Sequence, residues 1–194
     1  DGGGYWGDGL AGGNGGIRGT SNLTLAFAML VHAEDQGWLS DAQRERLADA
    51  GLGRAKRLDR VRGSWRYLAR CHVTGGGFSA ADKKKWGRSW QSSLWVGASG
   101  LAALLVWSDL GGDVRALVER VVVDEADQKI DAKPRDATPG NTAAEENGWD
   151  THAPAIAVAL FPDHPNAGKW LRAAQVLAAN TYSVRADRAS DALL

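Results

Sequence analysis

Apolar residues recur at helical spacing along most of the chain after residue 19. The first helix is predicted to begin at a Thr20 or Ser21 cap, and its apolar stripe comprises Leu23, Phe27, Leu30 and Val31. A short polar helix is predicted over 41–50, directly after Ser40. A longer basic helix follows over about 54–71, and its apolar stripe comprises Leu58, Val61, Trp65 and Leu68.

The second half of the chain continues this pattern. A helix over about 89–107 is apolar on most sides, which predicts a buried position. The next helix begins after Gly112, and its stripe comprises Val114, Leu117, Val118, Val121, Val122 and Glu125. Pro134 and Pro139 predict a loop over 133–140, and two further helices are predicted near 142–161 and 165–181.

No segment is convincing as a strand, so the fold is predicted to be all-α. One possible arrangement is a compact bundle. The other is a series of helical hairpins in an (α/α) toroid or incomplete toroid, whose long loops build a cleft at one end. The apolar helix over 89–107 and the long Gly- and Pro-rich loops favour the toroid.

The N-terminal segment differs from the rest because ten of its first 19 residues are glycine. Glycine at this density predicts a loop or flexible arm over 1–19, ahead of a helical domain over 20–194. The alternative is a cleft loop in which Trp6 and Arg18 contact a ligand. Gly7, Gly9 and Gly12 match a dinucleotide fingerprint, but neither a strand before them nor a helix directly after is predicted.

Composition narrows the classes of partner. The 194 residues contain 23 Lys+Arg and 23 Asp+Glu, and this balance argues against nucleic acid and anionic membranes, which attract basic proteins. The longest apolar run, over 96–107, is shorter than the roughly 20 residues that span a bilayer. Cys71 is the one cysteine, and the four histidines are scattered, so no cofactor or metal is expected. Acidic residues could still hold Ca²⁺, although their spacing does not support it.

Candidate chemistry concentrates near residue 145. Asn141, Glu145, Trp149 and His152 stand at i, i+4, i+8 and i+11, which places them on one helical face, and Glu146 lies on the neighbouring face. The alternative for Glu145 is a capping box with Thr142. Pro154 means that either the helix kinks or a new helix begins nearby.

A second group of candidates surrounds the start of the helix over 89–107. Indoles pack against the C–H faces of sugars, and amide or guanidinium groups bond to hydroxyls and carboxylates. Four residues here supply such groups and are candidates for binding a substrate: Trp86, Arg88, Trp90 and Gln91. His72, at the end of the basic helix, is a candidate catalytic base, and the alternative is a favourable charge at the helix end.

Two motifs carry a family resemblance. The stretch NTAAEEN (141–147), an alanine-rich helix and the stretch LFPDHPNAGKWLRAA (160–174) resemble the helical domain of heparinase II/III-like polysaccharide lyases. The family usually has a His after the Asn, whereas this chain has Thr142. The resemblance implies an α/α toroid that is part of a larger, secreted or periplasmic protein and that cleaves an acidic polysaccharide by β-elimination. It gives Asn141 the role of neutralising a uronate carboxylate, with Gln91 or Arg88 as helper.

Two other functions remain open. A glycoside hydrolase on a similar helical ring would use Glu145, Glu146 or Asp150 as acid and base. A helical carbohydrate-binding module would use the tryptophans and catalyse nothing. For the lyase, the candidate catalytic residues are Asn141, His72, Glu146 and His152.

Overall fold

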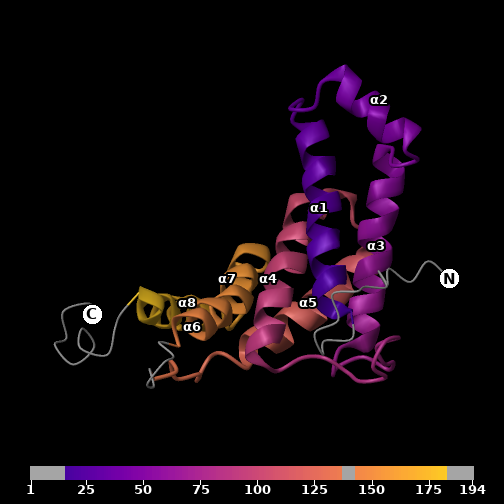
Figure 1. The fold of residues 1–194 in the computed structure, drawn as a ribbon. Coiled ribbons are helices and arrows are strands. Elements are labelled where there is room, and N and C mark those ends of the chain that lie inside the picture. Colours follow the sequence, from indigo (N-terminus) through magenta and orange to yellow (C-terminus); the bar gives the residue numbers. More distant parts are fainter. Residues whose placement is uncertain (1–15, 137–142, 183–194) are drawn as a thin grey trace. The chain divides into compact units, whose positions relative to one another are not determined.

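The structure is a computed structural model that describes residues 16–136 and 143–182. Helices account for 70% of these residues and none forms a strand, which confirms the all-α class (Figure 1). The helices are α1 (Ile17–Asp35), α2 (Asp41–Asp49), α3 (Arg54–Cys71), α4 (Trp90–Leu105), the 3₁₀ turn η1 (Trp107–Asp109), α5 (Gly112–Asp127), α6 (Ala144–Asp150), α7 (His152–Leu160) and α8 (Ala167–Tyr182). No described helix is both long enough and apolar enough to cross a bilayer.

The chain divides into two compact units. Unit 1 comprises the described residues up to Trp86 together with Ala98–Val121. Unit 2 comprises Gly87–Gly97 and the described residues from Val122 onward. Helices α4 and α5 each contribute one part to each unit.

Unit 1 is built on a pair of antiparallel helices, α1 and α3 (Figure 1). The whole predicted stripe of α3 is buried: Leu58, Val61, Trp65 and Leu68. Polar contacts join the end of α1 to the start of α3, because Arg57 donates to the carbonyl of Leu30 at 2.7 Å and forms an ion pair with Glu34. The predicted basic helix is therefore confirmed, together with its buried face.

The buried face of α1 differs from the prediction. Leu23 is 39% exposed and Phe27 and Leu30 are only half-buried, and of the predicted stripe Val31 alone is fully buried. The buried residues are instead Ile17, Thr20, Ser21, Thr24, Ala28 and Val31. Small side chains let two helices approach closely, and the Thr24 hydroxyl is satisfied locally by the carbonyl of Thr20 at 2.6 Å. The helix also begins at Ile17, within the segment over 1–19 that was expected to be an arm.

Helix α2 is a local structure that packing hardly supports, since none of its residues is buried. The helix begins directly after Ser40, as predicted, and Ser40 is its N-cap. The Ser40 hydroxyl accepts from the Gln43 amide, and the Gln43 side chain accepts from the Ser40 amide, which completes a capping box.

The arginines of α3 are largely engaged inside unit 1. Arg54 bonds both Asp35 and Asp109, and Arg66 pairs with Asp113 at 2.8 Å. Asp35 holds the pKa of Arg54 above its usual range, and Arg54 in turn lowers the pKa of Asp35. The basic character of this helix therefore serves contacts within the unit.

Unit 2 has its own core around Trp170 of α8, which is fully buried. Helix α8 packs against both α6 and α7. Asp127, at the end of α5, accepts from the Trp170 indole at 2.8 Å and from the Asn166 amide at 3.0 Å. Buried Asn147 bonds the backbone N–H and C=O of Arg135, which ties the loop before α6 to that helix.

The helix predicted over 142–161 is two helices, because α6 ends at Asp150 and α7 begins at His152. Pro154 is the third residue of α7, where a helix does not require its missing N–H. Of the two alternatives that Pro154 left open, the new helix is the one observed.

Candidate functional site

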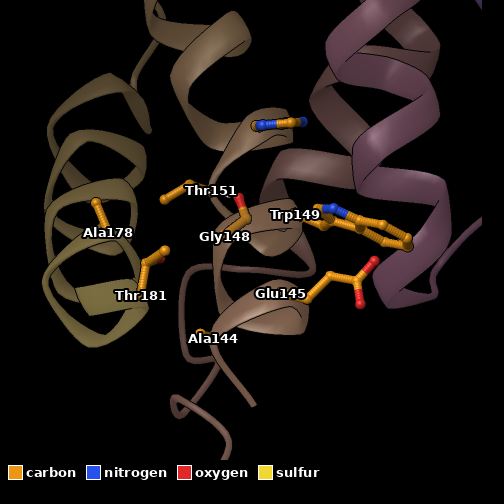
Figure 2. Close-up of a pocket in the computed structure, with 8 residues that line it drawn as sticks. Ala144, Glu145, Gly148, Trp149, Thr151, Ala178 and Thr181 are labelled. Carbon is orange, nitrogen blue, oxygen red and sulfur yellow. Dashed lines mark hydrogen bonds between the residues drawn. The ribbon is translucent and has the colours of Figure 1, made fainter. Parts of the chain in front are cut away.

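A pocket of about 500 Å³ lies in unit 2 (Figure 2). Its walls come from α6, from the junction of α6 with α7, and from α8. The residues that line it are Ala144, Glu145, Gly148, Trp149, Thr151, His152, Ala178 and Thr181. Three of the four residues predicted to share a face therefore line one pocket: Glu145, Trp149 and His152.

Helix α6 supplies the polar and aromatic side of the pocket. Figure 2 shows Glu145 and Trp149 projecting from α6 toward the same side. The N-cap of α6 is Ala143, which has no capping side chain, and Thr142, the partner in the capping-box alternative for Glu145, lies outside the described residues. Thr181 of α8 lies beside Gly148, where a Cβ would stand 3.4 Å from the Thr181 methyl group, an ordinary contact distance.

Trp149 is held in place by a second indole. Its ring stacks on Trp90, the first residue of α4, with 4.8 Å between the ring centroids and an interplanar angle of 18°. One face of Trp149 is thus covered by protein. Trp90 was predicted to bind substrate directly, whereas its observed contact supports Trp149.

His152 is the one histidine among the residues that line the pocket. It is the first residue of α7 and is half-buried, and burial lowers the pKa of its imidazole below the ordinary value of 6.5. A charged imidazolium loses hydration on burial, so the neutral form is favoured. At neutral pH the ring can therefore accept a proton.

The carboxylates near the pocket have separate environments. Glu145 is exposed and lines the pocket, whereas Glu146 is half-buried and is not among the lining residues. Asp150 is buried and forms an ion pair of 2.6 Å with Lys129, which lies in the turn after α5. The structure therefore places one of the three carboxylates in the pocket.

Two predicted site residues lie in the core of unit 1. His72 is fully buried after the end of α3, and its Nδ1 is 2.8 Å from the Thr74 hydroxyl. Trp86 is buried against the edge of the His72 ring, and its indole donates to the carbonyl of Leu68 at 2.9 Å. These are packing contacts, and they provide no open surface for a sugar.

The remaining predicted residues have varied positions. Arg88 is exposed and pairs with Asp124 at 2.8 Å, which raises the pKa of the guanidinium. Gln91 is half-buried in the first turn of α4, and Arg18 is exposed in the first turn of α1. Trp6 and Asn141 lie outside the residues that the structure describes.

Five of the eight lining residues were not predicted from the sequence, and neither was the role of Gly97 beside the pocket. Ala178 and Thr181 come from α8, which is distant in sequence from α6. Gly97 of α4 lies against His152, since a Cβ there would stand 2.7 Å from both the Cβ and the Nδ1 of His152. A glycine inside a strongly helical segment is the one signal for such a close approach.

Neither unit by itself brings three His, Cys, Asp or Glu ligand atoms together among its described residues. The comparisons with known proteins add no assignment. No family model matches the chain, and neither a curated protein nor a solved structure matches it.

Proposed function

We propose that the protein binds a polysaccharide in the pocket of unit 2 and cleaves it by β-elimination, with His152 as the base. The observation that carries this proposal is the meeting of an indole, a carboxylate and a half-buried imidazole in one pocket of about 500 Å³. The resemblance of NTAAEEN and LFPDHPNAGKWLRAA to the helical domain of heparinase II/III-like lyases agrees with this chemistry.

Sugar binding rests on Trp149. An indole gains apolar contact with the C–H face of a pyranose ring, and Trp90 holds this indole at a fixed angle. The Glu145 carboxylate and the Thr181 hydroxyl are hydrogen-bonding groups for the hydroxyls of a sugar.

His152 is the proposed base because its imidazole lines the pocket and its pKa is lowered by burial. In β-elimination the base removes the proton on the carbon next to the uronate carboxylate. The electron pair forms a C=C bond, the adjacent C–O bond breaks, and the leaving oxygen takes up a proton from solvent. This assignment replaces His72, whose ring is fully buried in unit 1.

The substrate class follows from the resemblance. Elimination needs an acidic proton next to a carboxylate, so the proposed substrate is a uronate-containing polysaccharide. The resemblance assigns its carboxylate to Asn141. Such polymers are extracellular, so a secreted or periplasmic location belongs to the same proposal.

A second candidate is a non-catalytic site for a neutral glycan. The observation in its favour is that none of the eight lining residues is Lys or Arg. A hydrolase has less support, because it needs two carboxyl groups at the scissile bond and Glu145 is the one carboxylate that lines the pocket.

The test is to incubate the full chain with hyaluronan, heparan sulfate and polyguluronate and to record ultraviolet absorbance from the new C=C bond. His152→Ala is expected to lower kcat by about 10²- to 10⁴-fold. His32→Ala, which alters a histidine of unit 1 outside the pocket, is the matched control and should retain turnover.

The other outcomes separate the alternatives. Release of reducing ends without the new absorbance would refute elimination and support a hydrolase. Binding of a neutral oligosaccharide that Trp149→Ala abolishes, with no cleavage of any polymer, would establish the binding module instead.

A further inference from the structure

We infer that Ser93 and Gly97 of α4 position the imidazole of His152, and that they act as positioning residues for the reaction at this pocket. The inference rests on the proposed function for its catalytic consequence. The positioning itself depends on contacts inside unit 2 and can be tested independently of catalysis.

Ser93 holds the backbone on both sides of His152. Its hydroxyl donates to the carbonyl of Asp150 at 3.2 Å, and its oxygen accepts from the amide of Ala153 at 3.0 Å. Ser93 is fully buried, so water does not compete for these bonds. One hydroxyl thus joins the last residue of α6 to the first turn of α7, which satisfies an amide that a helix start leaves unpaired.

Gly97 leaves the space that the ring occupies. A Cβ at this position would stand 2.7 Å from the Cβ and Nδ1 of His152 and 2.9 Å from its Cγ, shorter than any ordinary carbon contact. Gly97 lies inside α4, where glycine is less favourable for a helix than alanine. The close approach of the imidazole explains why this residue is a glycine.

The two residues belong to one stripe of α4. Trp90, Ser93 and Gly97 stand at i, i+3 and i+7, and all three contact the segment 149–153. Trp90 stacks on the Trp149 indole, Ser93 binds the backbone on either side of His152, and Gly97 adjoins its ring. A single helical face therefore orients both aromatic groups of the pocket.

Few charged groups surround this ring. Glu145 of α6 lines the same pocket, and Lys129 and Asp150 form their ion pair at the junction of α6 with α7. The lining residues of α8 are Ala178 and Thr181, and the α4 stripe carries no charge. Burial is accordingly the cause of the lowered pKa of His152.

The test uses NMR titration of the His152 ring in the full chain. Gly97→Ala adds a methyl group where the ring now lies, and the ring is expected to move toward the open pocket and solvent. Its pKa should then rise toward the ordinary value. Where elimination is detected, kcat should fall by about 10²-fold with little change in KM, as expected for a misplaced base.

Gly168→Ala is the matched control, because Gly168 also lies in a helix of unit 2 and a Cβ there meets nothing within 4 Å. It should leave the His152 titration unchanged. Ser93→Ala is the second variant, in case Gly97→Ala does not fold. It removes one oxygen and should accelerate hydrogen exchange of the Ala153 amide.

An unchanged His152 titration in folded Gly97→Ala would overturn the inference, as would unchanged exchange at Ala153 in Ser93→Ala. These readouts do not depend on turnover. Should the chain cleave no polymer, the proposed function fails while the titration still tests the positioning. Should His152→Ala abolish turnover while Gly97→Ala titrates like the wild type, the positioning alone fails.

Discussion

The buried ion pair between Lys129 and Asp150 offers the sharpest test of the unit 2 packing. Their side chains are 8% and 9% exposed, and Lys129 Nζ lies 2.6 Å from Asp150 Oδ1. At that distance the Coulomb attraction is about 6 kcal/mol for an effective dielectric constant of about 20. Desolvation of the two ions offsets much of it, so the net contribution of the intact pair is small.

Removing one partner destabilises the fold strongly, because the other charge is left buried and unpaired. We expect Lys129→Met to lower the free energy of unfolding by about 3–5 kcal/mol. Met has a similar length and fills the same space, so the loss reports the charge and not a cavity. The double variant Lys129→Met/Asp150→Leu should recover most of the loss, since it removes both charges.

The assay is urea unfolding of the full chain followed by circular dichroism of the helices. Arg66→Met is the control, since it breaks the half-exposed pair with Asp113 in unit 1 and should cost at most about 1 kcal/mol. The reasoning would be refuted by a Lys129→Met loss no larger than that of the control, or by a double variant no more stable than the single one.

Three further predictions concern separate elements. Burial lowers the pKa of His152 in the folded state, so below pH 6.5 the unfolded chain binds more protons than the folded chain. The free energy of unfolding of the wild type should therefore decrease as the pH drops from 6.5 through the folded-state pKa. Thermal unfolding measured across this pH range should show a smaller decrease in stability for His152→Gln than for the wild type. Asn147→Ala should lower the free energy of unfolding by about 1–3 kcal/mol, because the Asn147 side chain bonds the backbone of Arg135. Hydrogen exchange of the Arg135 backbone amide should become faster, and an unchanged exchange rate would contradict the role given to Asn147. Ser40→Ala should destabilise α2 by about 0.5–2 kcal/mol, because it removes the capping hydroxyl. Amide hydrogen exchange within α2 should become faster, while exchange in α3 stays at the wild-type rate.

The sequence predicted the helices of this protein well where local pattern and burial agree. The stripe Leu58, Val61, Trp65 and Leu68 is apolar and is buried as its spacing predicts, although Gly63 and Tyr67 on other sides of α3 are buried as well. The cap at Ser40 also needs only nearby residues, because the capping box closes within three positions.

Part of the candidate site was also predictable. Glu145, Trp149 and His152 stand at helical spacing, and they line one pocket although the helix breaks at Thr151. The break preserves their common side because Thr151 itself has helical backbone angles, φ −68° and ψ −25°.

The predictions for Trp86, His72 and the buried face of α1 differ from the structure, because the local sequence pattern does not determine which residues a side chain will contact. Trp86 and His72 have the residue types of a sugar site, yet they pack against each other in unit 1. In α1, hydroxyl and alanine side chains are buried while Leu23 is partly exposed. The apolar periodicity predicts the opposite, with Leu23 buried and the hydroxyl side chains exposed.

By itself the sequence determined which segments are helical, where α2 is capped, and which side of the segment 144–152 carries the indole, the carboxylate and the imidazole. These properties depend on residues within one or two helical turns. Tertiary structure alone decided that Asp150 pairs with Lys129, that α8 closes the pocket with Thr181, and that Gly97 makes room for His152. Each of these contacts joins residues more than 20 positions apart, and only packing in three dimensions selects such partners.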